Sequence, residues 1–253
     1  MILILGARGF VGSAFCAACA EAGLDFQGVD LDDYDGARGA RCDLLINADG
    51  NSKKYLAEKD PARDFRLSVL SVMDSIADFS FRRYLYISST AVYPDPSDPR
   101  RTAEDAVLDP AAQSRYGFHK RLAEELVVKY CPDWLILRLG GMVGEGLRKG
   151  PIHDILTGAP LWVGTKSRFQ FIHTRDVARI ALRMLAEGCG QEIFNVCGRG
   201  TVTLAEVQGM AGLAGENDLP AEVWDVNTDK AHRRFGLPST EDTVRAFIAR
   251  RRS

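Results

Sequence analysis

The start of the chain places a glycine turn between an apolar run and an apolar helix, and this arrangement restricts the fold more than any other feature. Residues 1–5 (MILIL) are continuously apolar, as a strand buried on both faces would be, and the run ends at Gly6. Residues 10–22 then carry small and apolar side chains at helical spacing, and Gly23 marks the stop. A strand, a sharp turn and a helix in this order predict the first unit of a parallel sheet.

Apolar runs and helical patterns alternate along much of the chain. Further strands are predicted at 24–30, 42–47, 83–88, 133–139 and 192–197. Helices are predicted after Pro61 and at 113–130, 175–187, 203–214 and 239–250. The strands are apolar throughout, which is typical of a parallel sheet covered on both faces. We therefore predict an α/β fold with a Rossmann-like, doubly wound parallel sheet and a small C-terminal lobe.

The opening turn has the spacing G-x-x-G-x-x-G, which suits the binding of a dinucleotide. Gly6 allows the sharp turn, Gly9 lets a pyrophosphate approach the backbone, and Gly12 lets the helix and strand pack closely. The N–H groups at the start of the helix would bind the phosphates. The turn residues predicted to contact the dinucleotide are Gly6, Arg8, Gly9, Phe10, Val11 and Gly12.

The choice between NAD and NADP depends on Asp30 and Arg8. Asp30 ends the second predicted strand, where an acid can bind a ribose 2′-hydroxyl, although a surface turn acid is the alternative. Arg8 could instead reach a 2′-phosphate, which would favour NADP. The acids beside Asp30 would repel that phosphate, so NAD is predicted, with NADP as the alternative cofactor.

A second set of residues points to proton transfer. Tyr116 and Lys120 have the spacing Y-x-x-x-K, which puts both on one face of a helix. An ammonium beside a phenol favours the phenolate, so we expect the pKa of Tyr116 to fall from about 10 toward neutral pH. Ser89 ends the preceding strand at the edge where ligands of such sheets bind. Tyr55 and Lys59 have the same spacing without such a strand, and are predicted to be solvated.

These motifs fall in one order along the chain. They are ISSTAVYP (87–94), YGFHK (116–120), LRLGGMVG (137–144), FIHTRDVA (171–178) and FNVCG (194–198). With the glycine turn, they resemble the extended short-chain dehydrogenase/reductases, the NAD-dependent epimerase/dehydratase family. The resemblance implies that Ser89 hydrogen-bonds the reacting oxygen, that Tyr116 is the acid/base, and that Lys120 tunes Tyr116 and binds the nicotinamide ribose.

The resemblance also implies further contacts and a division of the chain. Leu31 and Ala48 would join the cofactor site, and Thr90 and Arg168 would contact the substrate, with Arg168 as a surface residue being equally plausible. The predicted NAD(P)-binding domain is 1–144 together with 168–190. The predicted substrate lobe is 145–167 with 191–253. In that lobe, Trp162 is expected either to pack or to offer a stacking surface, with packing favoured.

Several positions depart from the family's pattern. Thr90 and Ala91 stand where related dehydratases carry an Asp-Glu pair, so dehydration is disfavoured. The stretch from Asp30 to Cys42 is too short for the helix and strand that usually follow. Phe169 stands where nucleotide-sugar enzymes usually carry an Arg, with Arg168 one place earlier. These departures weaken the expectation of a nucleotide sugar more than that of redox chemistry.

Composition excludes several other classes of protein. The 253 residues are 46% hydrophobic and 26% charged, with a net charge of −2, so no basic footprint for nucleic acid or a membrane surface is present. Six scattered cysteines suggest neither a disulfide framework nor a metal site, and a cytoplasmic setting is the default expectation. The sequence predicts an epimerase or reductase on a small molecule, in a possible homodimer. The alternative is a non-catalytic dinucleotide-binding sensor or scaffold.

Overall fold

The computed structural model describes residues 1–252, and the chain in it divides into two compact units. Unit 1 comprises Met1–Pro94, Val107–Arg138 and Ala178–Phe194. Unit 2 comprises Asp95–Ala106, Leu139–Val177 and Asn195–Ser253. The assignment of cofactor and substrate to separate parts of the chain stays a prediction.

A six-stranded sheet forms the centre of the fold, in the order β2-β1-β3-β4-β5-β9. The strands are β1 Ile2–Leu5, β2 Phe26–Val29, β3 Arg41–Asn47, β4 Ser80–Ser89, β5 Trp134–Leu139 and β9 Glu192–Val196. Ile2 lies opposite Phe26 on one side and Leu44 on the other, both in parallel register. The predicted α/β fold with a parallel, Rossmann-like sheet is therefore confirmed.

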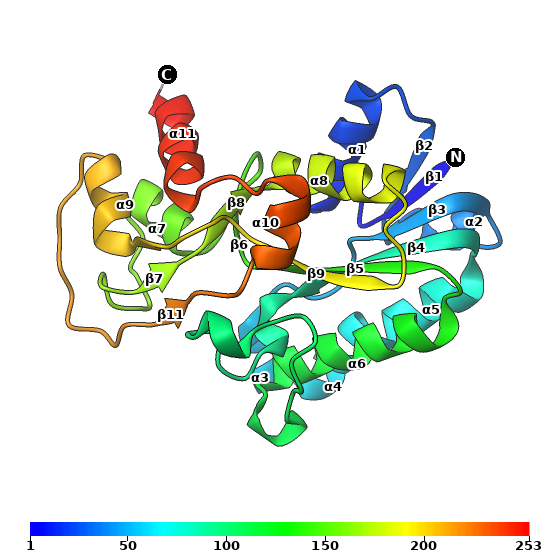
Figure 1. Ribbon diagram of the computed structural model, residues 1–253, viewed down its shortest axis with the longest axis horizontal. Coiled ribbons are helices and arrows are strands. Elements are labelled where there is room, and N and C mark those ends of the chain that lie inside the picture. The colour runs from blue at the N-terminus through cyan, green and yellow to red at the C-terminus, as the bar shows by residue number, and fades with distance from the viewer. Residues whose placement is uncertain (253) are drawn as a thin grey trace. The chain divides into compact units, whose positions relative to one another are not determined.

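Helices cover both faces of this sheet in unit 1. Those of unit 1 are α1 Gly12–Glu21, α2 Tyr34–Ala37, α3 Lys54–Lys59, α4 Pro61–Phe65, α5 Ser71–Asp78 and α6 Arg115–Tyr130, with most of α8 Thr174–Ala186. Helices α3 to α6 lie on one face, whereas α1 and α8 lie on the other (Figure 1). The side chains of Leu3, Leu45, Tyr84 and Ile136 are fully buried in the core between them, because the middle of each of these strands carries apolar or aromatic residues.

The sheet ends at β2 within the described residues. Between Val29 and Arg41 the chain forms only the short helix α2 and then enters β3, which pairs with β1. We expected the stretch from Asp30 to Cys42 to be too short for a helix and a further strand. The further strand is absent from this described stretch, but the short helix α2 does form in it. β2 is consequently an edge strand, and Asp30 lies at its end.

The helical region after Pro61 is less regular than its pattern suggests. Helix α4 continues into a π-helical turn at Arg66–Leu70 and only then into α5. A π-turn widens the helix by one residue per turn and is frequent at functional sites. The periodicity alone predicted one continuous helix here.

Unit 2 is built from small sheets and short helices. Its strands are β6 Gly141–Val143, β7 Arg168–Phe169, β8 Phe171–His173, β10 Val202–Thr203 and β11 Val223–Trp224. Its helices are α7 Pro151–Thr157, α9 Leu204–Met210, α10 Asp229–Phe235 and α11 Thr240–Arg252. β7 pairs with β10 and β11, and β6 pairs with β8. Across residues 1–252, no helix has the length and apolar character that crossing a membrane requires.

Candidate active site

The glycine turn has the geometry that its spacing predicts, with one difference. Gly6 has a φ of +71° and starts the turn after β1, and the Gly9 N–H donates to the Gly6 carbonyl at 2.9 Å. A Cβ added at Gly12 would lie 2.0 Å from the Gly6 carbonyl oxygen. Gly12 is therefore required by the turn itself, rather than by the packing of helix on strand that we expected. Gly9 is exposed, which leaves its backbone open to a ligand.

Arg8 and Asp30, which argue for different cofactors, are bonded to each other. Asp30 Oδ2 accepts from the Arg8 backbone N–H at 2.7 Å and from Arg8 Nε at 3.1 Å. The same guanidinium lies 3.2 Å from Asp32 and 3.6 Å from Asp33. One positive charge thus faces three carboxylates, and the local charge at the end of β2 is negative. Leu31, beside Asp30, is 78% exposed.

Ser89 and Tyr116 meet where β4 ends and α6 begins. The Ser89 hydroxyl accepts from the Ala91 N–H at 3.1 Å, so it caps the short helix Thr90–Val92, and it also faces the Tyr116 phenol as a hydrogen-bond partner. Ser89 therefore both caps the end of the strand and contacts Tyr116. Tyr116 is 7% exposed.

Gly117 is what allows this approach, and sequence reasoning missed it. A Cβ at Gly117 would lie 2.0 Å from the Ala91 carbonyl oxygen and 2.9 Å from its carbon. Only a residue without a side chain lets the first turn of α6 contact the segment after Ser89 so closely. Ser114 caps α6 by accepting from the Gly117 N–H at 3.1 Å. A glycine directly after the tyrosine was the signal that could have revealed this.

The pKa of Tyr116 departs from our expectation. Burial and, to a smaller extent, the Asp64 carboxylate together raise it to about 12, and the hydrogen bond with Ser89 acts in the opposite direction. We expected Lys120 to lower this pKa toward neutral, and that expectation is wrong for the protein in this structure. The reason is that desolvation of the phenolate exceeds the effect of its polar neighbours.

The Lys120 ammonium bonds elsewhere. It donates to the Tyr86 hydroxyl at 3.3 Å and to the Ile87 carbonyl at 3.2 Å, both on β4. Burial lowers the pKa of Lys120 to about 8, and the carboxylates of Asp49, Asp64 and Glu124 oppose that effect. Lys120 therefore lies in a nearly dry pocket under the strand that carries Ser89.

A buried ion pair holds the strand end that carries Ser88 and Ser89. Glu124, on α6 one turn after Lys120, accepts from Ser88 Oγ at 2.6 Å and from Arg138 Nε at 3.0 Å. Arg138 also donates to the Tyr93 hydroxyl at 2.9 Å. Because Glu124 and Arg138 are 0% and 1% exposed, this pairing joins β4, β5 and α6 in a fixed arrangement.

The segment after β3 passes close to Lys120. Asn47 is buried and donates to Tyr84 at 2.7 Å, and its Oδ1 accepts from the Asp49 N–H at 3.0 Å. A Cβ at Gly50 would lie 3.8 Å from Lys120 Nζ. The Asp49 carboxylate acts on Lys120 by raising the pKa of its ammonium. Ala48, predicted to contact the cofactor, is half-buried in this segment.

The competing Tyr-Lys pair lies outside this cluster. Tyr55 and Lys59 are both on α3, and Tyr55 is 60% exposed. The helical, solvated pair that we predicted is what the structure shows at these two positions.

The remaining predicted residues have varied surroundings. Thr90 is buried, with 2% of its surface exposed. In unit 2, Arg168 is exposed on β7, and its charge acts on the nearby Asp225 carboxylate. Trp162 is 86% exposed, so the expectation that it packs is wrong: its neighbours leave its side chain uncovered. His173 accepts from the Arg175 N–H at 3.1 Å, consistent with a satisfied structural residue.

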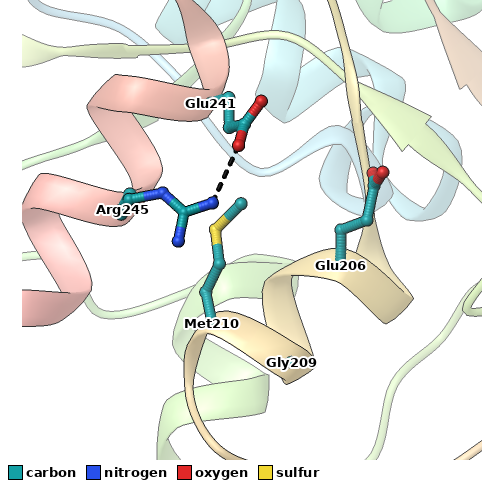
Figure 2. Close-up of a pocket in the computed structure, with 5 residues that line it drawn as sticks. All are labelled: Glu206, Gly209, Met210, Glu241 and Arg245. Atoms are coloured by element: carbon teal, nitrogen blue, oxygen red, sulfur yellow. Dashed lines mark hydrogen bonds and ion pairs between the residues drawn. The ribbon is translucent and has the colours of Figure 1, made fainter.

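Unit 2 also has a shallow hollow of about 370 Å³ between α9 and α11. It is lined by Glu206, Gly209, Met210, Glu241 and Arg245 (Figure 2). Arg245 is already paired with Glu241 at 2.8 Å, and Glu206 caps the start of α9. None of the predicted site residues lines this hollow. Among the residues that the structure describes, no group of three or more His, Cys, Asp or Glu side chains could hold a metal ion.

Comparisons with known proteins bear on the family and the fold. The sequence model of the NAD dependent epimerase/dehydratase family matches residues 2–197. No curated protein matches the chain. A UDP-galactose 4-epimerase structure is 20% identical, with a TM-score of 0.80, and the alignment covers 98% of this chain and 97% of that one.

Two further solved structures are similar over the full chain. UDP-glucose 4-epimerase from Thermus thermophilus, in complex with NAD, is 16% identical with a TM-score of 0.80, and the alignment covers 100% of this chain and 99% of that one. A dTDP-4-dehydrorhamnose reductase from Clostridium acetobutylicum is 15% identical with a TM-score of 0.79 and the same coverage, 100% and 99%. At these identities the likeness concerns the fold.

Proposed function

Because this chain belongs to the NAD-dependent epimerase/dehydratase family, we propose that it is an NAD-dependent epimerase or reductase acting at a hydroxyl or keto carbon. The observation that carries the proposal is the contact between Ser89 and Tyr116 at the end of β4, with Lys120 buried one turn further along α6. A small molecule, with nucleotide sugars as the favoured class, would be the substrate. Two of the similar structures are named as epimerases of UDP-sugars.

The residues around β1 and β2 fit the cofactor. The turn Gly6–Gly12 leaves the Gly9 backbone exposed before α1, where pyrophosphate would bind the free N–H groups. Asp30 would accept a hydrogen bond from the adenine-side ribose, beside Leu31 and Ala48. Tyr116 and Lys120 would contact the nicotinamide ribose. When bound, NAD supplies the redox chemistry that no protein side chain provides.

The protein's own part in the reaction is proton transfer. With a pKa of about 12, Tyr116 holds its proton at Oη at neutral pH, so the phenol is ready to protonate a keto oxygen during reduction. In the oxidising direction, Tyr116 must first release that proton to solvent, and the phenolate oxygen then takes the proton of the substrate hydroxyl, which requires nearby positive charge. Lys120 supplies that charge, and Ser89 holds the reacting oxygen.

Dehydration is not part of the proposal. Water loss needs an acid beside the reacting carbon, and the positions after Ser89 are Thr90 and Ala91, which are 2% and 4% exposed. Neither side chain can act as a strong acid. The alternative function is a non-catalytic sensor or scaffold that binds a dinucleotide, for which Ser89, Tyr116 and Lys120 would be dispensable.

One experiment separates these functions. The purified protein is analysed by mass spectrometry for bound nucleotide, then assayed with NAD(H) and UDP-, GDP- and dTDP-sugars, by NADH absorbance and by chromatography for epimers. We expect turnover that Tyr116→Phe lowers by about 10²-fold or more, with little change in NAD affinity. Tyr55→Phe is the matched control and should be silent.

The same two variants also show which results would contradict the proposed function. Full activity of Tyr116→Phe, or its loss in Tyr55→Phe alone, would mean that the acid/base is wrongly assigned. NAD binding without turnover of any sugar would remove the nucleotide-sugar substrate class. A tightly retained nucleotide would favour an epimerase, whereas ready exchange would favour a reductase.

A further inference from the structure

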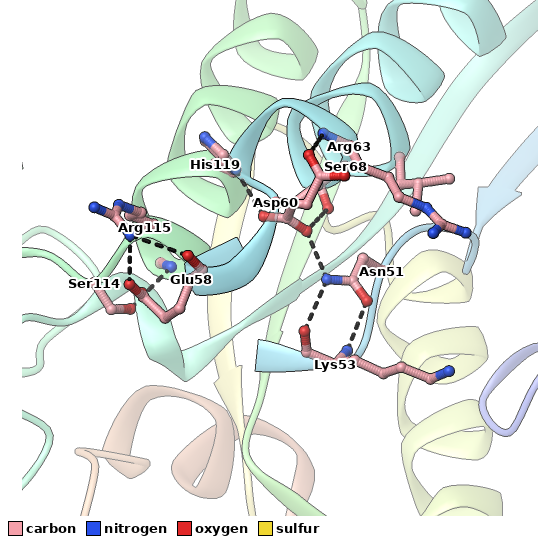
Figure 3. A network of polar contacts seen from close by, with 12 residues as sticks. Asn51, Lys53, Glu58, Asp60, Arg63, Ser68, Ser114, Arg115 and His119 are labelled. Atoms are coloured by element: carbon pink, nitrogen blue, oxygen red, sulfur yellow. Dashed lines mark hydrogen bonds and ion pairs between the residues drawn. The ribbon is translucent and has the colours of Figure 1, made fainter. Parts of the chain in front are cut away.

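A second buried acid lies beside the Tyr116 helix, and the proposed reaction does not use it. Asp64, on α4, is 0% exposed. Its Oδ2 lies 2.7 Å from His119 Nδ1, and its Oδ1 accepts from Asn51 Nδ2 at 2.6 Å and from Ser68 Oγ at 3.1 Å. Figure 3 shows His119, Asn51 and Ser68 gathered at this point from three different segments.

These bonds connect the segments that surround Lys120. His119 immediately precedes Lys120 on α6. Asn51 follows β3 and holds the Lys53 backbone in both directions, accepting from its N–H at 2.7 Å and donating to its carbonyl at 3.0 Å. Ser68 belongs to the π-turn. One carboxylate therefore fixes α6, the π-turn and the segment after β3 relative to one another.

The charge of Asp64 is balanced differently from that of the other buried acid. Glu124 faces the Arg138 guanidinium at 2.8 Å, so its negative charge is largely neutralised within its own pair. Asp64 is bonded to an amide, a hydroxyl and an imidazole, and of these only a protonated imidazole would carry compensating charge. Lys120, for its part, is buried against two neutral oxygens. A buried ammonium without a bonded anion needs negative charge from its surroundings.

We propose that Asp64, held in place by His119, is a positioning residue that supplies the counter-charge for Lys120. This inference rests on the proposed function, in which Lys120 must remain an ammonium to act on Tyr116 and on a ribose. It concerns a side chain that touches neither Tyr116 nor the reacting atoms.

The protonation equilibria of the site agree with this role. Burial lowers the pKa of Lys120, which lies at about 8 in balance with three carboxylates that act against that effect. Asp49 is the largest of the three, and the second is Asp64. The same carboxylate raises the pKa of Tyr116. The titratable groups that bond to Lys120 or act on its charge are Asp49 after β3, Asp64 on α4, Tyr86 on β4 and Glu124 on α6 itself. Tyr116 and His119 are the other titratable groups on this part of α6. On the outer side of α6, Arg115 pairs with Glu58 at 3.0 Å and is exposed.

The test measures the titration of Lys120 directly, by NMR of isotope-labelled lysine side chains, with Lys120→Arg used for assignment. The midpoint should lie near 8 in the native protein and fall by ~1 pH unit in Asp64→Asn. Asn is isosteric, and His119 can accept from its amide by changing tautomer, so the bonded network is kept. Asp60→Asn is the control, because it removes a half-buried carboxylate from the N-cap of the same helix and Asn caps equally well.

Two further measurements separate charge from packing. His119→Asn keeps the Asp64 charge and a donor toward it. The titration midpoint of Lys120 should therefore change no more than it does in the control variant Asp60→Asn. If turnover is found, Asp64→Asn should move both limbs of its pH profile to lower pH, because the pKa values of Tyr116 and Lys120 both fall. A purely structural role would reduce turnover at every pH without moving the limbs.

The results that would contradict this proposal differ from those that would contradict the proposed function. An unchanged Lys120 midpoint in Asp64→Asn, or an equal fall in Asp60→Asn, would overturn the counter-charge. A lowered midpoint in a protein that turns over no nucleotide sugar would support the counter-charge and count against the proposed substrate class.

Discussion

Lys120 is an ammonium group with 5% of its surface exposed, and burial lowers its pKa to about 8 from a reference of 10.5. A shift of this size corresponds to roughly 3 kcal/mol of unfavourable burial when the group is charged. The hydrogen bonds to Tyr86 and Ile87 offset part of that cost. At the scale of residues, the buried ammonium therefore lowers the stability of the folded protein at a proposed catalytic position.

We predict that Lys120→Met stabilises the cofactor-free protein by about 2 kcal/mol at neutral pH, while abolishing activity. The folded-state pKa is depressed, so between about 8 and 10.5 the unfolded chain binds a proton that the folded chain does not. Native stability should thus rise with pH across that window. Urea unfolding at neutral and alkaline pH measures both effects. Equal stability of the two proteins at neutral pH would contradict the assignment of Lys120 as a strained buried charge.

Also at the scale of residues, we expect Arg8 and Asp30 to set the preference between NAD and NADP. Arg8 lies within 3.6 Å of three carboxylates, so a ribose 2′-phosphate would meet net negative charge. We predict that NAD(H) binds more tightly than NADP(H), as measured by calorimetry. Tighter NADP(H) binding that Arg8→Ala removes would show that Arg8 leaves the acids to bind phosphate.

At the scale of elements, the close contact between α6 and the segment after β4 depends on Gly117. Because a Cβ at Gly117 would lie 2.0 Å from the Ala91 carbonyl, Gly117→Ala must push the first turn of α6 away from Ser89. We expect a loss of about 1–3 kcal/mol in stability and a marked loss of turnover. Thermal unfolding and the sugar assay check both.

Gly209→Ala is the control for that prediction. Gly209 lies within α9, and an added Cβ would meet nothing within 4 Å. Alanine should therefore raise stability by about 0.5–1 kcal/mol, because it favours the helix without a clash. A similar effect of both glycine substitutions would show that the close approach at Gly117 is not required.

The elements also show what a sequence can predict. Uniformly apolar strands such as Leu44–Ile46 and the turn at Gly6 follow local rules, so the parallel sheet was predictable. The π-turn at Arg66–Leu70 was not, because no periodicity distinguishes it from an α-helix. Asp64 and His119 are 55 residues apart, so their pairing depends on the folded packing of α4 on α6.

The candidate site was predictable to a similar extent. The spacing of Tyr116 and Lys120 identified both residues, and the structure places Ser89 beside Tyr116. The direction of the Tyr116 pKa was predicted wrongly, since burial cannot be judged from spacing. Trp162 was predicted wrongly for the same reason: an aromatic residue in an apolar run carries no local sign that it stays exposed.

The whole molecule combines unit 1, which holds the Ser89–Tyr116–Lys120 cluster, with unit 2, which holds Arg168. If the substrate is a nucleotide sugar, Arg168 offers a guanidinium whose fork suits its diphosphate. We predict that Arg168→Ala raises the KM for that substrate roughly tenfold or more and leaves NAD affinity intact. Steady-state kinetics and calorimetry test this. An unchanged KM would indicate a smaller hydroxyl substrate that does not use Arg168.

The early end of the sheet at β2 has a kinetic consequence. β2 is four residues long and, within residues 1–252, no strand lies beyond it, while Leu31 stands 78% exposed beside Asp30. An adenosine bound at this margin would have no further strand of the described sheet beyond it, and we expect this to ease its departure. The expected result is a short residence time, so that the nucleotide exchanges with the surrounding pool between catalytic cycles. Such a protein would follow the ratio of oxidised to reduced nucleotide around it, rather than carry a resident molecule through many cycles.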